Sequence, residues 1–329
     1  VRGAQRRLRE RGLQLVCERI VTQVNPALRA MPGYRRRLQP VAARLLEYGQ
    51  EVIERIPGPV TVDPSSWAAD PLVNALFVNP KRMQQVLSGR EVQRWLANNP
   101  VGDGDLYGLL LAMPNERKQL GMQLVGDRVR RDVKQTTMSF AEHEIVAVSA
   151  NMAELRKIML QPLADMIVSI VQGRIEAREQ QIADLQETLG MLKLKRKVVD
   201  PRVSGLDQLA GNSSGHAAAQ AQLNARIEET ERDLADARRG LADIEEYFDS
   251  LIAELEHPEK EFHLEALDLW LDRMNVVRDS RAEGASEVRL IRARRPDRPG
   301  RVAQFVRFPR KLVMDPAERL ERLGRQIGA

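Results

Sequence analysis

Two matched stripes of apolar residues in the second half of the chain constrain its fold more than any other feature. Between residues 168 and 199, apolar side chains recur at alternating steps of three and four, and a second stripe of the same spacing runs from residue 223 to 255. This period of about 3.5 residues is typical of helices that pack along a coiled-coil seam. A segment rich in Gly, Ser, Asp and Pro separates the stripes at residues 200–215. We therefore expect residues 141–260 to form a long antiparallel coiled-coil hairpin.

The register of this hairpin follows from its turn. If the chain reverses near residue 207, the apolar positions of the two stripes face each other along most of their length. Arg178 is the exception: it is predicted to lie opposite Ala237, where a small side chain leaves room for it. At 1.5 Å per residue, the hairpin should be roughly 60 Å long. The predicted seam comprises Ile175, Arg178, Ile182, Leu185, Leu189, Leu192, Leu223, Ile227, Leu234, Leu241, Ile244, Phe248 and Leu251.

Residues 1–100 are predicted to form a helical domain. Its first helix ends at Asn25-Pro26 and its second at the sequence PGP of residues 57–59, because proline cannot continue a helix. Three shorter helices are expected to follow, each preceded by a residue whose side chain caps helix N-termini. These predicted N-caps are Asp70, Asn79 and Ser88, the last with Glu91 in a capping box.

The segments on either side of the hairpin have strand character. Residues 101–140 are predicted to be a three-stranded β-meander, with turns at 114–117 and at Gly126-Asp127, and the sequence AEHEI at 141–145 is predicted to open the next helix. Residues 261–314 are predicted to form a second β piece with an Arg-rich hairpin, although 264–277 also fits a helical period. A short helix is expected at 315–329. The predicted fold class is mainly α with minor β, a mixed base with antiparallel strands from which the hairpin projects.

Composition narrows the class of protein. The 329 residues are 43% hydrophobic but only 4% aromatic, which favours helices over a β-sandwich. The lone Cys17 cannot form an intramolecular disulfide, which suits a reducing compartment, and its apolar helical neighbours predict a buried thiol. The most apolar run, residues 159–175, is interrupted by Pro162 and Asp165 and falls short of a membrane span. We expect a cytoplasmic protein with no membrane span.

No set of catalytic residues emerges from the sequence, and we expect neither a cofactor nor a metal. The best metal candidate groups His257, His263, Glu261 and Glu265. Pro258 interrupts the helix between the histidines, so they do not have the spacing of a known ligand pair. An enzymatic site at the base of the hairpin, around these residues, is the weakest of three alternatives.

The leading interpretation is a non-enzymatic interaction or scaffold protein whose coiled-coil arm engages a protein partner or a second copy of the chain. The alternative is a nucleic-acid-binding protein, since the formal net charge is +5 and arginines crowd the last hairpin. The predicted nucleic-acid contacts are Arg289, Arg292, Arg294, Arg295, Arg298, Arg301, Arg307 and the aromatic Phe305.

Overall fold

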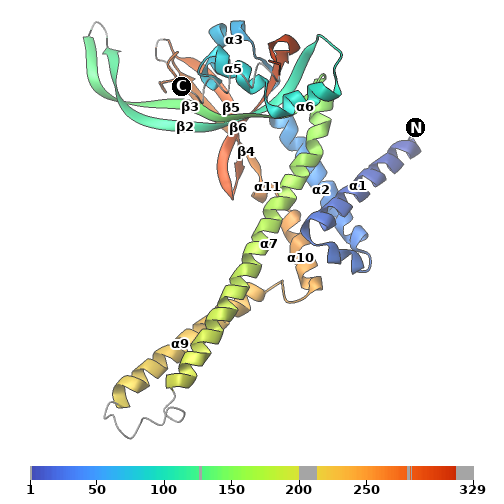
Figure 1. Cartoon of the computed structure of the whole chain (residues 1–329), viewed down its shortest axis with the longest axis vertical. Helices are drawn as coiled ribbons and strands as arrows, with labels where there is room; N and C mark the ends of the chain where they lie inside the picture. The colour runs from blue at the N-terminus through green and yellow to red at the C-terminus, as the bar shows by residue number, and fades with distance from the viewer. Residues whose placement is uncertain (1, 126–127, 200–212, 280–281, 283, 316–329) are drawn as a thin grey trace. The chain divides into compact units, whose positions relative to one another are not determined.

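The computed structural model describes residues 2–125, 128–199, 213–279, 282 and 284–315 (Figure 1). For residues 2–9, 123–130 and 213–217 it describes the backbone alone. The fold is mixed α+β, 57% helix and 26% strand. Two compact units are present, each built from two segments of the chain: residues 1–43 with 165–257, and residues 44–164 with 258–329.

The described residues of the first unit are helical. Helix α1 ends at the predicted position, where the Asn25 side chain accepts a hydrogen bond from the Ala27 amide and so starts the short helix η1. The prediction that the Cys17 thiol is buried is confirmed, and its neighbours Val16 and Ile20 are buried with it. The helices are α1 (Arg2–Val24), η1 (Pro26–Ala30), the start of α2 (Tyr34–Arg55), most of α7 (Met152–Val199), α9 (Ser213–Arg238) and α10 (Ile244–Leu255).

Polar contacts join α1 to its neighbours in this unit. Arg19 pairs with Asp165 of α7, and the amide of Gln23 donates to the Ser169 hydroxyl at 2.6 Å. On another side of α1, Glu18 accepts hydrogen bonds from Tyr34 and, at 2.7 Å, from Arg35. These contacts fix α1 against both α7 and the start of α2.

The second unit is built around one six-stranded sheet of strand order β3-β2-β6-β5-β4. Neighbouring strands in this order are antiparallel, whereas the short β1 pairs parallel to β6. Strands that precede and follow the long helices therefore join in one sheet, as predicted. The strands are β1 (Val60–Thr61), β2 (Asp105–Val125), β3 (Arg128–Ser149), β4 (His263–Leu271), β5 (Ser286–Arg295) and β6 (Arg298–Pro309).

The predicted three-stranded meander is wrong, because residues 105–149 form only β2 and β3. The supposed turn at 114–117 lies inside β2, where Pro114 pairs with Phe140 and Arg117 with Thr137. Residues 141–145, predicted as a helix start, continue β3, and α7 begins at Met152 after the capping side chain of Asn151. The ambiguous segment at 264–277 is a strand as far as Leu271, because β4 pairs with β5 along its whole length.

Short helices cover one face of this sheet. The predicted N-caps Asp70 and Asn79 are confirmed, since each side chain accepts a backbone amide hydrogen bond. The Ser88 capping box is wrong: Gly89 is the N-cap, and the buried Ser88 hydroxyl instead accepts from the Met314 amide at 2.8 Å. The helices are α3 (Pro64–Ala69), α4 (Pro71–Leu76), α5 (Pro80–Leu87) and α6 (Arg90–Asn98), with α11 (Pro258–Glu261) preceding β4.

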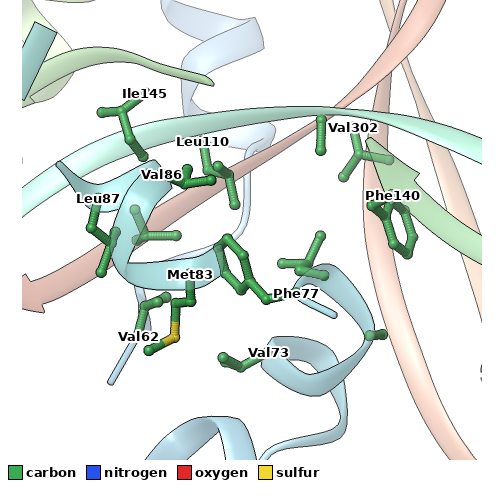
Figure 2. Packing of buried hydrophobic residues seen from close by; sticks show 14 of the residues in the cluster. Val62, Val73, Phe77, Met83, Val86, Leu87, Leu110, Phe140, Ile145 and Val302 are labelled. Carbon is green, nitrogen blue, oxygen red and sulfur yellow. The ribbon is translucent and has the colours of Figure 1, made fainter. Parts of the chain in front are cut away.

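Figure 2 shows the core between these helices and the sheet. Phe77 and Met83, from the helical layer, pack toward Leu110, Ile145 and Val302 of the strands. On β6, the neighbouring Phe305 belongs to a different layer: it is fully buried and lies 5.8 Å from the Arg156 guanidinium at the start of α7. Both faces of the central strands are therefore covered.

The turn predicted at Gly126-Asp127 lies outside the described residues, and two further predictions lie partly outside them. The helix predicted at 315–329 falls there from residue 316 onward, and so does most of the turn predicted at 200–215. Of that turn, residues 213–215 belong to α9. The long hairpin itself is not established by the fold, because α7 is a single long helix that begins within the second unit.

Candidate interaction surfaces

All but one of the predicted seam residues are buried or half-buried. Between residues 176 and 191 of α7, every position outside the stripe is exposed. Ile175, Leu192, Ile227, Leu234, Phe248 and Leu251 are buried, and Arg178, Ile182, Leu185, Leu189, Leu223 and Leu241 are half-buried. Ile244 departs from the prediction, because it begins α10 and is 43% exposed.

Arg178 occupies the position predicted for it but binds different atoms. Its Nη2 donates to the backbone oxygen of Ala237 at 3.4 Å and to that of Arg239 at 2.7 Å, rather than to an aspartate. These oxygens lie at the C-terminal end of α9, where carbonyl groups have no partner within the helix and carry partial negative charge. A second contact between the helices joins Lys193 to Glu231 at 2.8 Å.

The second long helix of the predicted hairpin is interrupted between α9 and α10, although its apolar stripe continues from residue 223 to 255. Gly240 has a φ of 75°, in the left-handed region that glycine adopts without strain, and Asp243 then caps the new helix α10. Arg37 of α2 holds α10 in place. Its guanidinium lies 4.5 Å from the centre of the Phe248 ring and pairs with Glu245 and Asp249.

The last two turns of α7 expose apolar side chains outside the seam. Met191 is 51% exposed, Leu194 63% and Val198 73%. Their spacing of three and four places them along one stripe of the helix surface. A contiguous exposed apolar stripe is a feature of contact surfaces, whereas single exposed apolar residues are ordinary.

Most cations of the predicted nucleic-acid hairpin already have carboxylate partners. Arg294 pairs with Glu265 at 2.7 Å and Arg301 with Glu144 at 3.3 Å. A paired guanidinium has less charge to offer a phosphate, because its carboxylate must be displaced or repelled first. The remaining pairs are Arg289 with Glu287, Arg295 with Asp297 at 2.7 Å, Arg298 with Asp297 at 3.7 Å, and Arg307 with Asp105.

The other two residues predicted for this contact are covered. Phe305 is fully buried, so its ring is not available to stack on a base. Arg292 is half-buried, and its Nε is inaccessible to solvent. The sequence grouped these residues because they lie close together between positions 289 and 307, but it did not show which face of each strand is covered.

The second unit contains a cavity of about 420 Å³ that the sequence did not indicate. Arg82, Arg90 and Arg94 line it together with His143. Burial lowers the pKa of His143, with the charges of Arg82 and Arg301 adding to the effect, so the ring is neutral at pH 7. Its Nε2 lies 2.6 Å from the backbone oxygen of Leu76. Glu91 also lines the cavity and pairs with Arg94 at 2.8 Å, so the cavity wall carries both positive and negative charge.

The residues suggested for metal binding are not brought together. Among the residues that the structure describes, no group of three His, Cys, Asp or Glu side chains could hold a metal ion. Glu261 is buried, whereas His257 and His263 are exposed.

Burial raises the pKa of the Cys17 thiol to about 11, which keeps it protonated and unreactive at neutral pH.

One basic surface was missed because its residues fell within the misassigned meander. The β2–β3 hairpin continues beyond β6, and Arg117, Lys118, Arg131 and Lys134 project from it into solvent. Leu120 and Met122 alternate with polar residues, a pattern typical of a strand with one buried face, yet both side chains are more than 60% exposed.

Comparisons with protein-family models, with curated proteins and with solved structures found no match to this chain. Among the described helices, α7 alone contains a stretch of 18 residues that is long and apolar enough to cross a membrane, with a mean hydropathy of 1.2. Of that stretch, 44% is buried within the protein, and core helices meet the same criterion.

Proposed function

We propose that this chain is a non-enzymatic interaction protein that presents an arm to a protein partner. The arm is residues 178–239 of α7 and α9, apart from those that the structure does not describe. The observation that carries the proposal is the exposed apolar stripe of Met191, Leu194 and Val198, which lies on α7 outside the seam.

We further infer that the arm is an antiparallel coiled coil. The covered positions recur with the seven-residue pattern on both helices, and the contacts of Arg178 with Ala237 and of Lys193 with Glu231 join them in antiparallel order. Because the apolar residues of the seam pack against each other, the outer faces of the two helices remain available to another molecule. The apolar stripe is therefore an additional feature, which the packing of α7 on α9 does not explain.

The chemistry around the stripe indicates what the partner offers. Lys195, Arg196 and Lys197 are exposed beside it, and within the described residues none of them has an ion pair. Cations also favour the C-terminal end of a helix, so their presence alone is not diagnostic. Together with the apolar stripe, they fit an amphipathic protein segment with apolar anchors and acidic flanks.

A site-specific photocrosslinker tests this proposal in cells that express the protein. Placed at residue 194, it should yield one major crosslinked protein, whose amount falls at least fivefold in the variant M191Q/V198Q. The matched control carries the crosslinker at Leu15, which is 65% exposed but lies on α1. Leu15 should give no such product.

Two outcomes would contradict the proposal. Equal products from positions 15 and 194 would mean that contact with the arm is not selective. A product with twice the 37.2 kDa mass of the chain would identify a second copy as the occupant, and the arm would then be a self-association element. Circular dichroism of M191Q/V198Q should match the wild type, because both side chains are exposed.

A further inference from the structure

Beyond its pairing with β6, the β2–β3 hairpin continues as a two-stranded ribbon, and only near its base do residues 275–277 pair with the outer edge of β3 among the described residues, with the Val277 amide donating to the Thr136 oxygen at 2.8 Å. Pairing of β2 with β6 stops at Ala112 and Val302, whereas its pairing with β3 continues as far as Val125 and Arg128. Figure 1 shows this ribbon reaching beyond the ends of the other strands. We define the ribbon as residues 113–125 and 128–141.

The exposed cations of the ribbon differ from those of the neighbouring strands, because they have no carboxylate partner among the residues that the structure describes. Arg117, Lys118, Arg131 and Lys134 are exposed, and within the described residues none of them forms an ion pair. On β5 and β6, by contrast, six arginines are paired with Asp or Glu. Within the described part of the sheet, the unpaired basic charge therefore lies on the ribbon rather than on the Arg-rich hairpin.

Register places these cations on both faces of the ribbon. Residues directly opposite each other in an antiparallel pair share a face. Leu120 pairs with Lys134 and Lys118 with Thr136, so the two lysines are diagonal neighbours on one face. Arg117, one residue along β2, points to the opposite face.

The ribbon also carries neutral polar groups of the kind that hydrogen-bond to phosphate and sugar oxygens. Asn115 and Gln119 place amide side chains on the same face as Arg117, whereas the Gln135 amide donates to the Met122 backbone oxygen at 2.9 Å. Leu120 is 64% exposed and Met122 is 66% exposed, and neither belongs to the described hydrophobic core. A two-stranded ribbon fits within the major groove of B-DNA, about 12 Å wide, where it has a phosphate backbone on each side and base edges in front.

We propose that the ribbon binds duplex DNA by lying in a groove, with its lysines and arginines on the two phosphate backbones. A ribbon with cations on both faces can contact the two phosphate backbones that flank a groove, whereas a flat anionic surface would contact only one face of the ribbon. Among the ribbon residues whose side chains the structure describes, Leu120 and Met122 are the large apolar residues that are more than 60% exposed, and two such residues are fewer than a membrane-surface segment buries in lipid. Duplex DNA is thus the occupant that the charge pattern favours.

Fluorescence anisotropy of the full chain with a mixed-sequence DNA duplex of about 30 base pairs tests the proposal. The salt series should give a linear log–log plot. Replacing the four cations, in R117Q/K118Q/R131Q/K134Q, should weaken binding at least tenfold and reduce the salt slope by about 0.9 for each phosphate that is no longer neutralised. The fold should persist, because all four side chains are exposed.

The matched control is R36Q/K81Q/K157Q/K260Q, which removes the same charge from four other exposed cations without ion pairs among the described residues. It should weaken binding less than threefold. A further variant, L120S/M122S, removes two exposed apolar side chains but no charge. It should weaken duplex binding at least threefold and leave the slope of the salt plot unchanged.

The proposal would be overturned if the wild-type chain did not bind the duplex, or if the ribbon variant and the charge control lost equal amounts of duplex affinity. Tighter binding to a single strand than to the duplex would also overturn it. So would binding to phosphatidylserine vesicles that the ribbon variant abolishes while its duplex binding persists. A loss of duplex binding confined to R289Q/R294Q/R298Q would move the contact to the Arg-rich hairpin.

Discussion

Arg178 Nη2 lies 2.7 Å from the backbone oxygen of Arg239, so a side chain in the middle of α7 caps the end of α9. The same nitrogen also reaches the Ala237 oxygen. A cation at this position binds carbonyl groups that α9 cannot satisfy itself, and the aliphatic part of the side chain fills the seam beside Ala237. One residue thereby contributes both to the seam and to the ending of a helix.

Replacing this arginine should loosen the end of α9. For R178L, which keeps the apolar part, we expect a loss of about 1 kcal/mol, because only the hydrogen bonds of the cation disappear. Hydrogen exchange of amides 232–238 should accelerate roughly fivefold, which that energy implies. The exposed R232L, on the outer face of α9, is the control and should leave these amides unchanged. Equal protection in R178L and the wild type would show that the cap contributes nothing.

Arg37 should matter to α10 far more than its neighbour Arg36 does. R37A removes the stacking on Phe248 and two ion pairs, but the carboxylates are well exposed, so we expect a loss of only about 1 kcal/mol. Faster hydrogen exchange of the α10 amides should report this loss of stability. R36A changes an exposed arginine without an ion pair among the described residues, and should have an effect below about 0.5 kcal/mol. If both variants behave alike, α10 does not depend on this contact.

Two glycine-to-alanine changes should have opposite signs. A Cβ on Gly108 would lie 2.9 Å from Ile145 Cγ2 and 3.2 Å from the Ala147 oxygen, so G108A should destabilise the sheet by about 1–3 kcal/mol. A Cβ on Gly190 has nothing within 4 Å, and G190A should stabilise α7 by about 0.5–1 kcal/mol. Thermal unfolding of both variants measures the contrast. A stabilising G108A would mean that β2 and β3 are less closely packed than described.

Glu18 should make the first unit sensitive to acid. Hydrogen bonds from Tyr34 and Arg35 lower the pKa of its carboxyl from the ordinary 4.5 to about 2. Because the folded-state pKa is depressed, this stabilisation is complete above pH 4.5 and is lost as the pH falls toward 2. The stability of the wild type relative to E18Q should therefore be constant from pH 7 to about pH 5.5 and then decline. A difference that does not vary down to about pH 3 would contradict this assignment.

The features that sequence predicts best here are those set by local periodicity and by proline. The alternation of three and four residues identified the covered positions of α7 and α9, including Arg178 opposite Ala237. Asn25-Pro26 marked the end of α1, and the pairs Asp70-Pro71 and Asn79-Pro80 marked helix starts. In each case the determining interaction lies within a few residues along the chain.

The features that it missed depend on partners distant in sequence. Residues 114–117 look like a turn, but they lie within β2 because residues 137–140 of β3 provide a continuous ladder. Ser88 has the sequence context of an N-cap, yet it binds the amide of Met314, more than 200 residues away. For the surfaces, sequence revealed where arginines are abundant, but not that Glu265 or Asp105 neutralises them.

The sheet also sets an order of events during synthesis. β2 and β3 leave the ribosome together as a hairpin, but the edge of β2 between Asp105 and Ala112 pairs only with β6, whose residues 302–309 are translated after α7, α9 and α10. Until then, that edge exposes unpaired amides and carbonyls beside apolar side chains, a state that invites pairing with other chains. The nascent protein therefore has a period of vulnerability whose length equals the translation time of its helices, and slowing the ribosome within them should lengthen the time in which a chaperone is needed.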